Sequence, residues 1–181
     1  MKKLLVSGCS FTGDNFAVDG IRKRWCNHVA DNLGYELVNL GRAGAGNEYI
    51  FTSLYNYLKN NKQPDMVIAA WSKSERRDFK NRDRWQNDRM DLRGDLDYHI
   101  EKTNIYKELM ELVCKTKGIE YHSFQMIELY PKDRDNVQGK TIGFLSKVEF
   151  EKANEDFISD ADRHPSAIGH EKIGQYIYEN L

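Results

Sequence analysis

The sequence predicts an α/β domain built around a parallel β-sheet. Short, nearly continuous apolar runs at residues 4–6 and 66–71 are typical of strands that are buried on both faces. Elsewhere apolar residues recur at helical spacing, and Gly34 and Gly118 stand where helices would end. The resulting order of strand, helix, strand, helix and strand favours parallel strands joined by right-handed crossovers.

The first half of the chain alternates strands with helices. The first helix places Trp25, Val29 and Leu33 on one face and ends at Gly34. Asn47, or the glycine before it, is in position to cap the second helix. The elements predicted here are a strand at 4–6, a helix at 24–33, a strand at 35–40, a helix at 48–59 and a strand at 66–71.

Residues 72–99 interrupt this alternation. They are dense in Arg, Lys and Asp, which predicts a charged insert or lid, and such mixed charges are more typical of a solvated surface than of a binding site. Residues 125–162 form a long irregular stretch in which a short helix near 144–150 is expected to act as a cover. The remaining predicted elements are a helix at 105–117, a strand at 119–124 and a final helix at 166–181.

Composition limits the possible functions. One domain, 1–181, accounts for a chain of 181 residues. Twenty-seven basic and twenty-eight acidic residues give a net charge of −1, which favours neither nucleic acid nor an anionic membrane as a partner. Three scattered cysteines predict no disulfide framework and no zinc site, so no metal or other cofactor is expected. No signal peptide or membrane-spanning run is recognisable, which predicts a cytoplasmic protein.

Ser10 is the first candidate catalytic residue. It follows the first predicted strand, and ligands of open α/β sheets bind outside the carboxyl ends of the strands. A serine hydroxyl needs a general base and a group that orients the base. His164 can be the base and Asp162 the orienting acid, with Asp160 in reserve. The alternative is that residues 8–12 form an ordinary loop with a helix cap.

The glycine-rich run at residues 39–47 is the second candidate. Acyl transfer builds negative charge on a carbonyl oxygen, and backbone N–H groups aimed at that oxygen lower the barrier. The N–H groups of Ser10 and Gly44 are the expected donors, and Asn47 can add a side-chain donor. The glycines could instead shape a tight turn, and Asn47 could cap a helix. Their spacing and position do not fit a dinucleotide-binding loop.

At these clusters the sequence resembles the SGNH hydrolase superfamily, also known as GDSL esterases and lipases. Residues 8–12 resemble the first family block, with Cys9 where aspartate is common. Residues 39–47 resemble the second block and put Gly44 in the place of its oxyanion-hole glycine. Residues 162–165 resemble the last block, which carries the catalytic histidine. The resemblance implies a flavodoxin-like three-layer α/β/α sandwich, and the charged insert is similar to that of phage-type members.

The third family block departs from the pattern. It normally reads Gly-x-Asn-Asp after the third strand, and its asparagine donates to the oxyanion. Residues 69–76 contain no asparagine. Ser72, Ser74, Arg76 or Asn47 could substitute for it. Loss of one such donor costs about a hundredfold or more in rate.

The sequence therefore predicts a serine esterase that hydrolyses a short acyl ester, of acetyl type, on a carbohydrate or another small polar molecule. Two rival hypotheses remain. One is a catalytically impaired relative that serves as a carbohydrate-binding or structural module, suggested by the altered third block. The other is a nucleic-acid-associated protein that uses the arginines of residues 76–85, although the acidic residues in the same insert argue against it.

Overall fold

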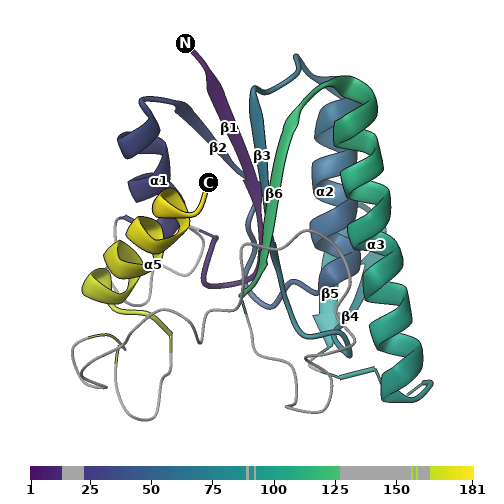
Figure 1. Cartoon of the computed structure of the whole chain (residues 1–181). Coiled ribbons are helices and arrows are strands. Elements are labelled where there is room, and N and C mark those ends of the chain that lie inside the picture. Colours follow the sequence, from purple (N-terminus) through teal and green to yellow (C-terminus); the bar gives the residue numbers. More distant parts are fainter. Residues whose placement is uncertain (14–22, 89, 92, 127–155, 157, 159–163) are drawn as a thin grey trace.

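The computed structural model describes residues 1–13, 23–88, 90–91, 93–126, 156, 158 and 164–181 (Figure 1). The elements are β1 (Lys3–Ser7), α1 (Trp25–Leu33), β2 (Glu36–Asn39), α2 (Asn47–Asn60), β3 (Met66–Trp71), β4 (Arg77–Asn81), β5 (Arg84–Asp88), α3 (Leu96–Lys117), β6 (Glu120–Gln125) and α5 (Ala167–Glu179). The cover helix expected near 144–150 lies outside the described residues.

The main sheet is parallel, as predicted, with strand order β2-β1-β3-β6. β1 lies inside it: Leu5 is in register with Val38 of β2 and with Val67 of β3. Each inner strand is buried on both faces, which explains why the runs at 4–6 and 66–71 are continuously apolar.

Helices cover both faces of this sheet and complete three layers (Figure 1). α1 and α5 pack on one face, where Leu4 and Val6 enter the core. α2 and α3 pack on the other face, which receives Leu5. Alternate residues of β1 thus serve two cores. None of the described helices is long and apolar enough to span a membrane.

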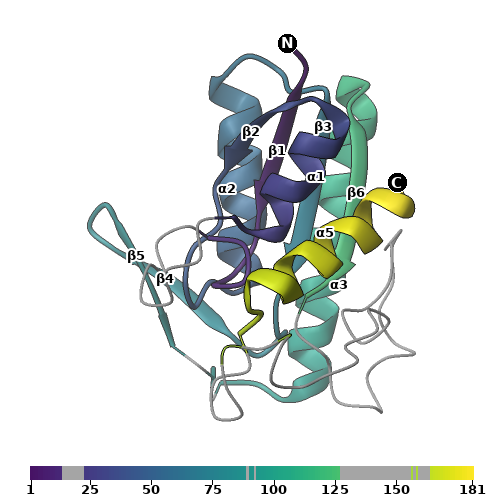
Figure 2. The same cartoon turned by 90° about the vertical axis from the view of Figure 1, so that its left-hand side faces the viewer.

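The charged insert contains regular structure that the sequence analysis missed. β4 and β5 form an antiparallel hairpin that is separate from the main sheet (Figure 2). Its two-residue turn is Arg82-Asp83, and Arg82 has a φ of 55°, a conformation that glycine usually supplies. Because no glycine marks the turn, the hairpin has no recognisable turn signal.

α3 starts earlier than predicted. It begins at Leu96, where the carboxylate of Asp95 accepts a hydrogen bond from the backbone N–H of Tyr98, whereas apolar periodicity placed the start at 105. The reason is that the buried face of its first turns is polar. That buried face carries His99, Thr103 and Lys107.

α1 and α5 approach each other closely at Gly174. A Cβ added there would lie 2.6 Å from the Cβ of His28 and 2.9 Å from the carbonyl oxygen of Trp25. We therefore expect Gly174→Ala to destabilise the protein by about 1–3 kcal/mol through overpacking, although alanine is the better helix former. Denaturant unfolding measures this change. Gln175→Ala, exposed on the same helix, is the control and should change stability by less than about 0.5 kcal/mol.

Candidate active site

Ser10 lies in a tight turn directly after β1. The backbone N–H groups of Thr12 and Gly13 both donate to the carbonyl oxygen of Cys9, at 2.9 and 3.0 Å. The indole N–H of Trp25 donates to the Thr12 hydroxyl at 3.2 Å, and the Asn39 amide donates to the Thr12 carbonyl at 2.7 Å. These bonds fix the turn, and they leave the Ser10 hydroxyl at the carboxyl-terminal edge of the sheet.

His164 meets Ser10 across the fold. Its Nε2 lies 2.8 Å from the Ser10 Oγ, which is hydrogen-bond distance for a nucleophile and its base. Ser10 is only 6% exposed, and the Phe11 ring packs edge-on against the His164 ring with centroids 4.9 Å apart. The structure therefore brings together the two residues that the sequence analysis selected as nucleophile and base.

The start of α5 positions His164. Ser166 caps this helix, because its hydroxyl accepts a hydrogen bond from the Gly169 N–H at 3.1 Å. The Ser166 N–H donates to the carbonyl of Asp156 at 2.8 Å, and the His164 carbonyl accepts from the Ile158 N–H at 2.9 Å. Backbone bonds on both sides of Pro165 thus anchor the segment that carries the histidine.

The predicted orienting acid lies outside the described part of the chain. Asp162 and its reserve, Asp160, both lie outside the described residues, so the orienting role of Asp162 stays a prediction. Within the residues that are described, no three His, Cys, Asp or Glu side chains gather as a possible metal site.

The glycine-rich loop lies beside the Ser10 turn. The Arg42 N–H donates to the Gly8 carbonyl at 3.0 Å, and Gly41 approaches Gly13 so closely that a Cβ on Gly41 would lie 2.7 Å from the Gly13 nitrogen. Gly44, the expected oxyanion donor, has a φ of 75°, which favours glycine at this position. The glycine-rich loop and the Ser10 turn are thus in direct backbone contact.

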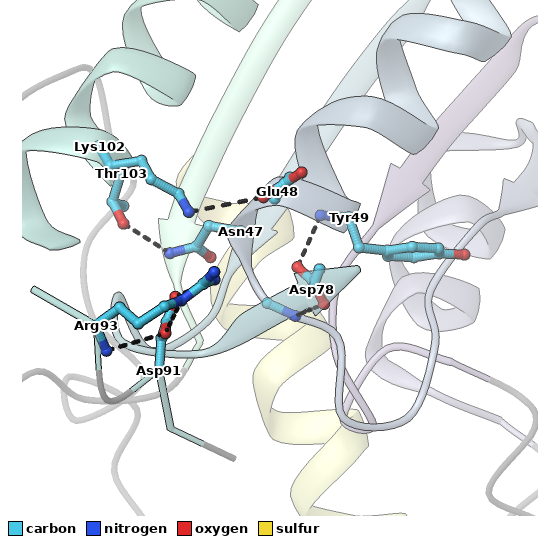
Figure 3. A network of polar contacts seen from close by, with 9 residues as sticks. Asn47, Glu48, Tyr49, Asp78, Asp91, Arg93, Lys102 and Thr103 are labelled. Atoms are coloured by element: carbon cyan, nitrogen blue, oxygen red, sulfur yellow. Dashed lines mark hydrogen bonds and ion pairs between the residues drawn. The ribbon is translucent and has the colours of Figure 1, made fainter. Parts of the chain in front are cut away.

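Asn47 holds the end of β3. Its Oδ1 accepts from the Ser72 N–H at 2.7 Å, and its Nδ2 donates to the Ser72 carbonyl at 3.1 Å. Nδ2 also donates to the Thr103 hydroxyl at 3.1 Å (Figure 3). Both amide hydrogens are therefore used within the protein. To donate to a substrate oxygen, Asn47 would have to give up one of these bonds, so its expected role in the oxyanion hole stays a prediction.

The residues proposed to replace the third-block asparagine occupy different environments. Ser72 and Ser74 are buried, and among the described residues neither hydroxyl has a hydrogen-bond partner. Arg76 instead donates to the Ala45 carbonyl at 3.1 Å, so it contacts the glycine-rich loop. Buried hydroxyls without partners are uncommon, which keeps Ser72 and Ser74 as candidate donors to a bound substrate.

The sequence analysis missed two groups of residues near the site. The first belongs to the hairpin: Asp78 and Asn87 both contact the glycine-rich loop. The second is a buried pair in which Lys107 Nζ donates to Gln125 Oε1 at 3.2 Å, while Gln125 Nε2 donates to the Ser72 carbonyl at 2.8 Å. A polar residue at every fourth position of α3, ending at Lys107, was the available signal for the second group.

Solved structures match nearly the whole chain. No protein-family model matches the sequence, and a comparison with curated protein sequences finds no match. A protein assigned to the lipolytic G-D-S-L family, from Desulfitobacterium hafniense, superposes with a TM-score of 0.64 at 15% identity and 100% coverage of both chains. The esterase EstA from Pseudoalteromonas sp., in a structure inhibited by monoethylphosphonate, gives 0.63 at 12% identity, covering 99% of this chain and 96% of that one.

A third match is to a larger protein. It is a carbohydrate esterase family 2 enzyme with a carbohydrate-binding domain, from Corynascus thermopiles (Myceliophthora fergusii). The TM-score is 0.60 at 12% identity, covering 98% of this chain and 64% of that chain. At such identities the likeness establishes the fold.

Lys107 makes the stability of the fold depend on pH. Burial lowers the pKa of Lys107 from 10.5 to about 7, whereas the unfolded chain keeps the ordinary value. Between pH 7 and 9 the unfolded state therefore binds more protons at Lys107, so the free energy of unfolding should rise with pH in this window, by about 2 kcal/mol. Urea unfolding across this range should show the rise in the wild type and in the exposed control Lys115→Met, but not in Lys107→Met.

Proposed function

We propose that this chain, which has the fold of the SGNH hydrolases, is a serine hydrolase that cleaves carboxylic esters, with Ser10 as nucleophile. One observation carries the proposal. The Ser10 hydroxyl and His164 Nε2 come from sequence positions 154 residues apart and lie 2.8 Å from each other. Esterases among the solved structures with this fold support the reaction class.

Acylation begins at the Ser10 hydroxyl. As Oγ attacks the ester carbonyl carbon, His164 Nε2 takes its proton, and the carbonyl π electrons move onto oxygen. When the tetrahedral intermediate collapses, the bond to the leaving alcohol breaks, and the His164 proton passes to the alcohol oxygen. The products of this step are an acyl-Ser10 ester and a free alcohol.

The negative charge that forms on the carbonyl oxygen needs fixed donors. We assign this role to the backbone N–H groups of Ser10 and Gly44, with Ser72 and Asn47 as side-chain candidates. The close approach of residues 41–42 to the Ser10 turn supports a shared oxyanion hole. In deacylation His164 takes a proton from water as the water oxygen attacks the acyl carbon. The bond between that carbon and Ser10 Oγ then breaks, the His164 proton passes to Oγ, and the carboxylic acid leaves.

The substrate class is a short acyl ester, of acetyl type, on a carbohydrate or small polar molecule. The sequence offers no long exposed apolar stretch that would hold a lipid chain. A matching structure that is a carbohydrate esterase supports a sugar as the alcohol part. With p-nitrophenyl esters, we expect kcat/KM to fall as the acyl chain lengthens from acetate to octanoate.

Covalent labelling tests the nucleophile without knowledge of the natural substrate. We expect a fluorophosphonate probe to add one phosphonyl group at Ser10 in the wild type and none in Ser10→Ala, because an activated serine attacks the phosphorus. His164→Ala should label at least a hundredfold more slowly, since the base is gone. Intact-mass measurement and peptide mapping locate the label.

His122→Asn is the matched control for the histidine, because His122 bonds Glu120 on edge strand β6 and not Ser10. It should label at the wild-type rate. A folded wild-type protein that does not label would contradict the esterase proposal and favour the carbohydrate-binding or structural module. Attention would then turn to the altered block at residues 69–76.

The orienting acid can be identified by substitution. If Asp162 orients His164, Asp162→Asn should lower kcat by about two to four orders of magnitude with a small change in KM, because the acid stabilises the imidazolium of the transition state. Asp160→Asn should stay within about threefold of the wild type. The opposite ranking in steady-state assays would assign the role to Asp160.

A further inference from the structure

The hairpin of β4 and β5, together with Arg76 directly before it, contacts the loop from 42 to 46. The Arg42 guanidinium donates to the Trp85 carbonyl, and the Asn87 amide donates to the Ala43 carbonyl at 3.3 Å. Gly44 packs against the Asn87 amide. The Arg76 guanidinium donates to the Ala45 carbonyl, and the Asp78 carboxylate accepts from the Gly46 N–H. The segment whose sequence suggested a solvated lid therefore contacts residues 42–46 of the glycine-rich loop.

Asp78 is the most buried of these contacts. It is 7% exposed, and its two carboxylate oxygens accept hydrogen bonds from the N–H groups of Gly46, at 2.9 Å, and Tyr49, at 2.8 Å (Figure 3). These N–H groups lie at the start of α2 and have no partner within the helix, so Asp78 caps α2 from another element. Burial raises the pKa of Asp78, and the two backbone bonds oppose that rise.

Close approach at Gly46 makes this cap specific. A Cβ on Gly46 would lie 2.7 Å from Asp78 Oδ2 and 2.9 Å from the Cβ of Arg76. Only a residue without a side chain lets β4 come so near. Gly46 therefore allows the hairpin to dock on the loop, in addition to shaping the turn itself.

Asn87 contacts Gly44 directly. A Cβ on Gly44 would lie 2.6 Å from Asn87 Oδ1 and 2.8 Å from Nδ2, so the amide fills the space beside the left-handed turn. Trp85, on the same face of β5, packs edge-on against Tyr49 with ring centroids 5.4 Å apart. Gln86, between them, is exposed on the opposite face.

A loop with glycines at 41, 44 and 46 has high conformational entropy when free, so an N–H group in it is a poor preorganised donor. Oxyanion stabilisation requires donors that do not reorganise during the reaction. The side-chain donor of the third family block is missing here. The β4–β5 hairpin, which follows residues 69–76 in the sequence, holds the glycine-rich loop instead.

We infer that the β4–β5 hairpin holds the glycine-rich loop in its catalytic conformation, and that Asp78 and Asn87 are positioning residues for the Gly44 N–H. This inference rests on the proposed esterase function. The residues of the hairpin that contact the loop then hold it in place, and the hairpin is not a lid. Its residues act on the reaction through the loop, without contacting the substrate.

The test compares Asp78→Asn and Asn87→Ala with two exposed hairpin controls, Asp83→Asn and Gln86→Ala. We expect kcat for p-nitrophenyl acetate to fall about tenfold to a hundredfold in both test variants, because a donor displaced by about 1 Å loses much of its effect. KM should change by less than about threefold, as for an interaction made in the transition state. The controls should match the wild type.

Two further readouts separate positioning from general damage. Hydrogen exchange of the Gly46 and Tyr49 N–H groups should accelerate in Asp78→Asn, while exchange in β1 stays as in the wild type. The acid limb of the kcat–pH profile should keep its midpoint, since the Ser10–His164 pair is untouched. Thermal unfolding identifies any variant that fails to fold, and the milder Asn87→Ala then carries the test.

Wild-type kcat in both test variants would overturn the inference, whether or not the loop amides exchange faster. A shifted acid limb would also overturn it, because the damage would then include the nucleophile and base. Failure of the esterase proposal gives a different result: the wild type itself would neither label at Ser10 nor hydrolyse the ester, while the exchange experiment would still report on the loop.

Discussion

The position of β1 between β2 and β3 is the constraint on which the rest of the structure depends. This strand is buried on both faces and apolar from Leu4 to Val6, and the turn that carries Ser10 follows directly at its end. The parallel order brings the carboxyl ends of β2 and β3 to the same edge. The glycine-rich loop follows β2 and Ser72 follows β3, so both lie at the edge of the sheet where Ser10 lies.

Polar side chains hold together the ends of the strands and helices at this edge of the sheet. Asn47 joins the start of α2 to the end of β3, and Gln125 joins the end of β6 to the same carbonyl, that of Ser72. Each amide satisfies backbone groups that the sheet and helix ends expose. In the hairpin, the carboxylate of Asp78 does the same for the start of α2, where it accepts from two backbone N–H groups. Buried polar groups that are hydrogen-bonded in this way restrict the conformation of the backbone segments they join.

The sequence predicted the parts of the fold that depend on apolar periodicity. The parallel sheet and the helices α1, α2 and α5 follow from continuous or helical apolar patterns, and the meeting of Ser10 with His164 follows from their places beside strand and helix ends. The start of α3 was wrong because His99, Thr103 and Lys107 are buried polar residues, which a hydrophobic pattern reads as exposed. The hairpin was missed because its turn uses Arg82 where glycine is usual. The contacts of Asp78 and Asn87 depend on tertiary docking, which no local pattern encodes.

The bond between Ser10 and His164 also sets when the site can exist during synthesis. Its two partners are 154 residues apart in the sequence, so Ser10 leaves the ribosome long before His164. β1 and its neighbours can assemble first, yet the Ser10–His164 bond cannot form until the segment at the start of α5 has docked. Under the proposed esterase function, a chain that stops before α5 would lack the base for Ser10, so ester hydrolysis would report on the docking of that helix.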